Sequence, residues 1–225
     1  MQVAIDGPAG AGKSTVAQIL AKKLNLVYID TGAMYRALTW KALHMCIPLD
    51  NTDKLCELTI QTEIHFEPFE SQQKVFCDGI DISEHIRTPE INNNVSILAS
   101  HTKLRAIMVK KQQQMAEHRS VVMDGRDVGE CILPQADYKF FLTASLEDRS
   151  FRRFQEMKQK GMEAELETVC MLLRQRDEDD SKRKTGALKV LHDSIVLDTS
   201  TMNVEQVVEL LLSFMGVNNN AVPVG

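Results

Sequence analysis

One short run near the start of the chain has the glycines, the lysine and the hydroxyl group of a phosphate-binding loop. The run reads Gly7, Pro8, Ala9, Gly10, Ala11, Gly12, Lys13, Ser14 and Thr15. Its glycines allow successive backbone N–H groups to turn toward phosphate oxygens. Lys13 can reach β- and γ-phosphates, and the Ser14 hydroxyl can ligate Mg²⁺. This spacing predicts a site for a nucleoside triphosphate.

The context of the loop is the one that phosphate binding requires. An apolar run, Val3–Ile5, leads into Asp6 before the loop, and a helical pattern begins at Ser14. The loop is therefore predicted to join a strand to a helix whose N-terminus adds the positive end of its dipole. The Asn/Thr-Lys-x-Asp segment of switch GTPases is absent, and no strand pattern ends in the Asp-Glu pair common in motors. These features favour a kinase.

Polar groups also follow two further strand patterns. The residues concerned are Asp30, Thr31, Tyr35 and Arg36 after the first, and Asp124, Arg126 and Asp127 after the second. Open α/β sheets bind ligands at the carboxyl ends of their strands, beside the phosphate loop. Each of these ends offers an arginine next to a carboxylate, which predicts a site for a second phosphorylated molecule.

Short apolar runs alternate with helical patterns along the whole chain. The runs are Val3–Ile5, Val27–Ile29, Val121–Met123, Tyr138–Leu142 and Ile195–Leu197, and the predicted helices cover 14–24, 33–44, 95–117, 146–160, 163–174 and 204–214. Continuous apolar runs this short fit strands that are buried on both faces of a parallel sheet. The alternation predicts an α/β P-loop fold over 1–225, with a five-stranded parallel sheet flanked by helices.

Two segments interrupt this alternation. Residues 62–82 have a period near two and contain Asp78-Gly79, a strong hairpin signal, which predicts a small antiparallel β insertion within 61–91. Residues 147–183 contain two charged helical patterns on either side of Gly161, which predicts a second, helical insertion. The last residues, 217–225, are predicted to fray.

Composition and charge narrow the class of protein. The net charge of −5 lacks the basic excess of a nucleic-acid-binding protein, so no nucleic-acid partner is expected. No apolar run approaches the roughly 18 residues of a membrane span, and the first residues lack a secretory signal pattern. The cysteines form no CxxC pair and are odd in number, which indicates reduced thiols. We therefore expect a cytoplasmic protein without a membrane partner, and a monomer.

Four motifs together resemble those of the bacterial cytidylate kinases, a family of P-loop nucleoside monophosphate kinases. They are DGPAGAGKST from Asp6, DTGAMYR from Asp30, DGRDVG from Asp124 and the RDxxDxxR pattern from Arg176 to Arg183. The resemblance extends from Gln2 to about Phe214, and it includes a β-rich insertion after the second helix. It implies ATP as phosphate donor with Mg²⁺, and CMP and dCMP as acceptors.

The resemblance also implies roles for individual residues. It assigns Gly7–Thr15 to the donor ATP, and 147–183 to a lid in which Arg149, Arg152 and Arg153 are candidate phosphate contacts. The acceptor site then contains Thr31, Tyr35 and Arg36, the base-reading residues Ser96, Arg105 and Asp127, and the ribose- and phosphate-binding residues Arg126, Arg176, Asp180 and Arg183. Lys13, Arg126 and Arg183 are expected to supply catalytic positive charge, and 61–91 is expected to form the monophosphate-binding subdomain.

The chain departs from the family pattern in two places. Glu130-Cys131-Ile132 stands where Thr-Val-Val is frequent, and Thr185-Gly186-Ala187-Leu188 stands where the family commonly has Ser-Pro-Leu. Two other functions remain open at this point: another P-loop kinase, acting on UMP, shikimate or dephospho-coenzyme A, and a nucleotide-dependent switch without an acceptor.

Several of these residues also have a purely structural interpretation. Arg149, Arg152 and Arg153 could form a solvated helix face paired with Glu147 and Glu156. Tyr35 could be a core aromatic residue, and Asp177–Asp180 could be a solvated turn. Asp127 could serve only to hold Arg126 in an ion pair.

Overall fold

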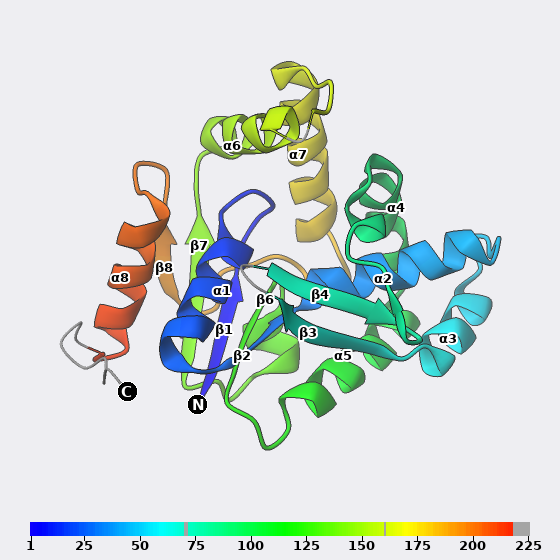
Figure 1. Ribbon diagram of the computed structural model, residues 1–225, viewed down its shortest axis with the longest axis horizontal. Helices are drawn as coiled ribbons and strands as arrows, with labels where there is room; N and C mark the ends of the chain where they lie inside the picture. The colour runs from blue at the N-terminus through cyan, green and yellow to red at the C-terminus, as the bar shows by residue number, and fades with distance from the viewer. Residues whose placement is uncertain (70–71, 160, 218–225) are drawn as a thin grey trace.

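The computed structural model describes residues 1–69, 72–159 and 161–217, and a five-stranded parallel sheet forms its centre (Figure 1). The strands are β1 (Gln2–Asp6), β2 (Val27–Asp30), β6 (Val121–Gly125), β7 (Tyr138–Thr143) and β8 (Ile195–Asp198), in the order β2-β6-β1-β7-β8. Neighbouring strands pair in parallel throughout. All five predicted strands and the α/β fold are confirmed.

Helices cover both faces of this sheet because successive strand residues point to opposite sides. Val3 and Ile5 pack with α1 (Lys13–Leu24) and α8 (Val204–Phe214), whereas Ala4 packs with the other helical layer. That layer consists of α2 (Thr31–His44), α3 (Thr52–Gln61), α4 (Pro89–Ala99) and α5 (Thr102–Ala116). The central strands β1 and β6 are therefore buried on both faces, and polar groups gather at the strand ends.

The small antiparallel insertion is also confirmed. It consists of β3 (Ile64–Phe69), β4 (Gln72–Cys77) and β5 (Ile80–Asp81), in that order. Asp78 and Gly79 both have positive φ, as the two central residues of a type I′ turn require. Val75 and Cys77 attach the insertion to the core cluster that contains α2.

Three details differ from the sequence prediction. The helix predicted over 95–117 is divided into α4 and α5 at Ser100 and His101, and the ring of His101 lies 2.8 Å from both Leu49 O and Thr52 Oγ1. These contacts join the break to the start of α3, a helix that the periodicity did not reveal. The alternative in which Asp177–Asp180 form a solvated turn does not hold, because α7 (Leu166–Ser181) continues through these residues.

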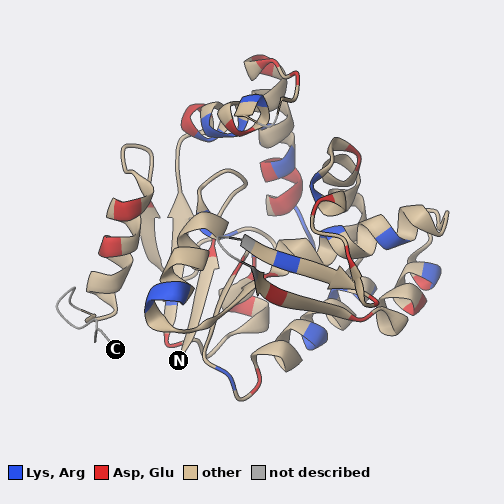
Figure 2. Cartoon of the chain, in the orientation of Figure 1, with Lys and Arg blue, Asp and Glu red and all other residues tan. Residues whose placement is uncertain are grey.

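Two helices stand above the carboxyl ends of the strands (Figure 1): α6 (Leu146–Gln159) and α7. Val169 and Leu173 of α7 pack against Ala9 of the phosphate loop. Both helices carry basic and acidic residues (Figure 2). Two short helical turns complete the elements, η1 (His85–Arg87) and η2 (Val128–Ile132).

No helix among the described residues is long and apolar enough to cross a membrane. All five cysteines are free thiols, as predicted. The tail predicted to fray lies outside the described residues, apart from Val217.

Candidate active site

The carboxyl ends of β1, β2 and β6 open into a cavity of about 850 Å³, which α4, α6 and α7 also border. Most of the predicted site residues line it: Ala9, Gly10, Gly12, Lys13, Ser14, Thr15, Thr31, Tyr35, Arg36, Ser96, Arg105, Arg126, Asp127, Arg153, Arg176, Asp180 and Arg183. Of the predicted residues, Gly7, Pro8, Ala11, Arg149 and Arg152 are outside this lining. The fold therefore brings the predicted donor and acceptor residues to one hollow.

The phosphate loop has the backbone that its glycines permit. Gly7 has φ of 149°, and a Cβ there would come closer than 3.0 Å to the carbonyl oxygen of Leu142 on β7. Gly10 and Gly12 also have positive φ, and Gly12 is the N-cap of α1. The loop can thus present N–H groups to an anion at the N-terminus of α1.

Lys13 is buried inside this loop. Its Nζ donates a hydrogen bond to the carbonyl of Pro8 at 2.8 Å, and its side chain reaches the cavity. Burial, followed by the charge of Arg126, lowers the pKa of Lys13 to about 7. A bound phosphate would favour the charged form, because a nearby opposite charge stabilises an ammonium group.

Ser14, Asp124 and Tyr28 form a chain of hydrogen bonds beside the loop. Ser14 Oγ donates to Asp124 Oδ2 at 2.9 Å, and the buried Tyr28 hydroxyl donates to Asp124 Oδ1 at 2.7 Å. Burial, and then the neighbouring Asp30, raise the pKa of Asp124 to about 6.

These oxygens fit a site for Mg²⁺. A hydroxyl and a carboxylate are hard oxygen donors, and Mg²⁺ in kinases is held by one or two such groups together with water and substrate phosphates. Among the described residues, no group of three or more His, Cys, Asp and Glu side chains could hold a metal ion alone. Ser14 and Asp124 thus offer oxygen donors that could complete the coordination of a Mg²⁺ ion bound by nucleotide phosphates.

Asp6, at the end of β1, organises the turn after β6. Its two carboxylate oxygens accept hydrogen bonds from the backbone N–H groups of Val128 and Gly129, each at 2.8 Å. Burial raises the pKa of Asp6 to about 6. Asp6 therefore fixes the position of Asp127, the residue immediately before this turn.

The turn after β2 places Thr31 and Arg36 at the cavity. Thr31 Oγ1 donates to the backbone carbonyl of Asp124 at 2.7 Å, and Arg36 pairs with Asp30 at 2.7 Å. Asp30 is also the N-cap of α2, since its carboxylate accepts from the N–H of Ala33 at 2.7 Å. One capping carboxylate thus holds the arginine in place.

The predicted base-reading residues meet at another part of the cavity. Arg105 of α5 forms a buried ion pair with Asp127, and the Arg105 guanidinium lies 5.5 Å from the ring centre of Tyr35. The Tyr35 hydroxyl is buried with no hydrogen-bond partner, and Ser96 of α4 lines the same cavity. An unpaired buried hydroxyl beside an ion pair is available to a polar ligand.

Arginines from three elements surround one carboxylate. Arg126 Nε donates to Asp180 Oδ2 at 2.7 Å, and Arg183 pairs with the same carboxylate. Burial, followed by the charge of Arg126, lowers the pKa of Arg176 to about 10, and its Nε has no hydrogen-bond partner. Arg126 is thus not paired with Asp127, contrary to the structural interpretation considered from the sequence, because the fold brings Asp180 to Arg126 and Arg105 to Asp127.

The arginines of α6 have separate surroundings. Arg149 is buried and donates to the carbonyl of Ala9 at 3.1 Å and to Asp177 at 2.6 Å. Arg153 pairs with Glu156 at 3.0 Å and lines the cavity, whereas Arg152 bonds to Thr199, beyond β8. Among Arg149, Arg152 and Arg153, only Arg153 lines the cavity. It is also the one that pairs with Glu156, as the helical spacing allowed.

Sequence reasoning did not single out Tyr28 as a functional residue. A tyrosine within an apolar strand pattern gives no sign of where its hydroxyl points. The only available signal was its position two residues before Asp30, on a strand predicted to adjoin the site.

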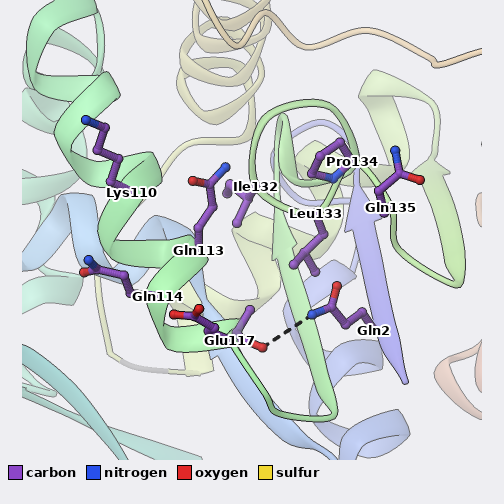
Figure 3. A pocket seen from close by; sticks show the side chains of 10 residues that line it. Gln2, Lys110, Gln113, Gln114, Glu117, Ile132, Leu133, Pro134 and Gln135 are labelled. Atoms are coloured by element: carbon purple, nitrogen blue, oxygen red, sulfur yellow. Dashed lines mark hydrogen bonds between the residues drawn. The ribbon is translucent and has the colours of Figure 1, made fainter.

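A second hollow, of about 450 Å³, lies near the amino end of β1 (Figure 3). Gln2, Gln113 and Glu117 line it, and Gln2 Nε2 lies 3.4 Å from the carbonyl of Ala116. None of the predicted site residues borders this hollow. It is on the side of the sheet away from the strand ends that carry the charged groups.

The chain is similar in sequence to one family of known proteins. The family model described as cytidylate kinase matches residues 3–216. Cytidylate kinases of Bacillus cereus and Bacillus thuringiensis are 47% and 46% identical over 215 residues, which is 96% of this chain and 96% of each relative. A solved structure of an uncharacterized protein from Eubacterium ventriosum has a TM-score of 0.51 at 12% identity, covering 97% of this chain and 99% of the other, and so shares the fold.

Proposed function

The chain belongs to the cytidylate kinase family, and on that premise we propose that it transfers the γ-phosphoryl group of ATP to CMP and dCMP. In this reaction a phosphate oxygen of the acceptor forms a bond to the γ-phosphorus of ATP. The bond from that phosphorus to the β–γ bridging oxygen breaks, leaving ADP and CDP or dCDP. The observation that carries the proposal is that the phosphate loop and the Arg105–Asp127 pair line one and the same cavity.

The residues of the loop would bind the donor. Backbone N–H groups from Gly7 to Thr15 would cradle the phosphates, and Lys13 would contact the β- and γ-phosphates. When bound through Ser14, Mg²⁺ would neutralise charge on the donor phosphates. The lid arginines Arg149 and Arg153 would contact the donor only after their bonds to Asp177 and Glu156 are exchanged for phosphate.

The acceptor would occupy the opposite end of the cavity. Arg36, Arg126, Arg176 and Arg183 would hold its phosphate and Asp180 its ribose, in keeping with the family motif. The Asp127 carboxylate would accept a hydrogen bond from the amino group of cytosine, a pairing known from base recognition in nucleic acids. Ser96, Arg105 and Tyr35 would complete the contacts with the base.

Positioning and electrostatics would account for most of the catalysis. The acceptor phosphate is already ionised at neutral pH, so no general base is needed, and two polyanions must be held in line against their repulsion. Lys13, Arg126 and Arg183 supply positive charge in a site shielded from water. We assign 61–91 to the acceptor subdomain and 147–183 to a lid that excludes water from the transferred group.

We further propose that the protein works as a cytoplasmic monomer. Free thiols support a reducing compartment.

One assay tests the proposed function. ADP release is measured by coupled assay with ATP and each of CMP, dCMP, UMP, AMP and shikimate. We expect fast turnover with CMP and dCMP and much slower turnover with the others. Preference for another acceptor would contradict the proposal, and ATP hydrolysis independent of any acceptor would instead indicate a nucleotide switch.

A further inference from the structure

One departure from the family pattern, at Glu130-Cys131-Ile132, is in contact with the chain segment that contains the other. Residues 182–194 connect α7 to β8, and we call residues 184–191 of this connection the strap. Lys189 of the strap pairs with Glu130 of η2 at 2.6 Å, and Leu191 lies near Gly129. The strap and η2, which are far apart in the sequence, therefore pack together.

The strap is also attached to the other elements that carry acceptor residues. The N–H of Leu188 donates to the carbonyl of Asp180 at 2.9 Å, at the end of α7. Thr185 Oγ1 donates to Thr102 Oγ1 of α5 at 3.3 Å, one turn before Arg105. The position of the strap is thus coupled to α5, α7 and η2.

Gly186 is the point at which the strap touches the predicted base-reading residues. It is buried and has φ of 64°. A Cβ at this position would come closer than 3.0 Å to both Arg105 Nη2 and Asp127 Oδ2, the atoms that form the ion pair. The backbone angle favours glycine, and a Cβ at this position would push the ends of the Arg105 and Asp127 side chains out of their present places.

We infer that Gly186 is a specificity-determining positioning residue, which covers the Arg105–Asp127 pair from the strap side and leaves it open to the acceptor from the cavity side. Arg105 and Asp127 are only 4% and 8% exposed, and both border the cavity. A base can therefore approach the pair from one direction, and exclusion of water strengthens its electrostatic contacts. The inference rests on the proposed function, because it assumes that this pair reads the acceptor base.

The test compares two Gly→Ala variants with similar backbone angles. In Gly186→Ala, the new methyl group must displace Arg105 or Asp127, and a displacement of about 1 Å can cost on the order of 10²-fold in reaction rate. We expect kcat/KM for CMP to fall by at least about 10-fold, the CMP:UMP ratio of kcat/KM to fall as well, and KM for ATP to stay within about twofold. Gly216 provides the matched control, since it has φ of 70° and a Cβ there would meet nothing within 4 Å.

The results of this test distinguish a failure of the proposed function from a failure of the inference about Gly186. If wild-type protein does not phosphorylate CMP, the proposed function is wrong. If wild-type protein is active and Gly186→Ala keeps the CMP:UMP ratio, or changes it no more than Gly216→Ala does, the inference about Gly186 is wrong.

A measurement on the wild-type protein covers the case in which Gly186→Ala does not fold. Amide hydrogen exchange of residues 184–191 should slow when CMP binds, because the base would lock the pair against which Gly186 packs. ATP alone should have little effect on this exchange. Equal exchange with and without CMP would overturn the inference.

Discussion

Arg126 donates a hydrogen bond from Nε to Asp180 Oδ2 at 2.7 Å, although the two residues are 54 positions apart in the sequence. The contact joins the end of β6 to the last turn of α7. Arg183 pairs with the same carboxylate, and the side chain of Asp180 is 1% exposed. One buried carboxylate therefore balances arginines from two parts of the chain before any phosphate is bound.

Removal of this carboxylate should destabilise the nucleotide-free protein. Breaking a buried ion pair from one side leaves an uncompensated charge, so Asp180→Ala should lower the free energy of unfolding by about 3–5 kcal/mol. Inorganic phosphate should restore more stability to this variant than to the wild type, because it would supply the missing negative charge. Thermal unfolding with and without phosphate tests this, with Glu178→Ala as the control, since Glu178 pairs with Lys182 on the surface at 3.0 Å. An equal loss of unfolding free energy in Asp180→Ala and Glu178→Ala would contradict the prediction.

The phosphate loop depends on one lysine for its point charge. Lys13→Ala should lower kcat by about 10²-fold or more, the usual effect of losing one preorganised electrostatic group. Circular dichroism should show an unchanged fold. Lys22→Ala, on the exposed face of α1, should keep full activity. A Lys13→Ala enzyme that retains more than about a tenth of wild-type kcat would rule out this role.

Tyr28 should influence Mg²⁺ through Asp124. Without the Tyr28 hydroxyl, Asp124 Oδ1 loses its 2.7 Å hydrogen bond, and the carboxylate can rotate away from Ser14. Loss of such an outer contact commonly weakens metal binding by about 10-fold or more. Tyr28→Phe should therefore raise the Mg²⁺ concentration required for half-maximal rate, while KM for CMP stays the same. Tyr138→Phe is the control, since its hydroxyl bonds to the carbonyl of Met215 at 3.3 Å, far from the loop. The same Mg²⁺ requirement in both variants would argue against the role.

Base choice should depend on Asp127. Cytosine offers an amino donor at the position where uracil has a carbonyl, which would face the carboxylate and leave a buried charge unpaired. Asp127→Asn should narrow the CMP:UMP ratio of kcat/KM, because the amide can turn its NH₂ group toward uracil. The comparison is kcat/KM for both acceptors in the variant, the wild type and Asp193→Asn, which changes a surface aspartate paired with Lys139. If activity falls equally for both acceptors, Asp127 only holds Arg105.

Asp6 should make stability depend on pH in an identifiable range. Its pKa is about 6 in the folded protein, against 3.8 ordinarily, so between these values the folded state holds a proton that the unfolded state has lost. This contribution to stability is complete below about pH 4 and disappears as the pH rises through about 6. The difference in unfolding free energy between wild type and Asp6→Asn should fall by about 3 kcal/mol across this range. Urea unfolding at several pH values measures it, and a constant difference would show that Asp6 is ionised throughout.

The chemical groups and the layers of the fold could be predicted from the sequence because they depend on local patterns. The loop from Gly7 to Ser14 requires fixed spacing within one turn of chain, and apolar runs such as Val121–Met123 indicate buried strands directly. Parallel strands then bring their carboxyl ends to one edge, so Lys13, Arg36 and Arg126 had to lie near one another.

The partner of each charged group was decided by the tertiary structure. Local spacing allowed Arg149 to pair along its own helix, but in the structure Arg149 bonds to Ala9 and Asp177. It also allowed Asp127 to pair with Arg126, but in the structure Asp127 pairs with Arg105. A buried charge must pair with whichever opposite charge the fold brings to it, because its desolvation is too costly to leave unbalanced. Sequence separation carries no information about that choice, and neither the Tyr28–Asp124 bond nor the contact of Gly186 with the Arg105–Asp127 pair exists until the distant elements have packed.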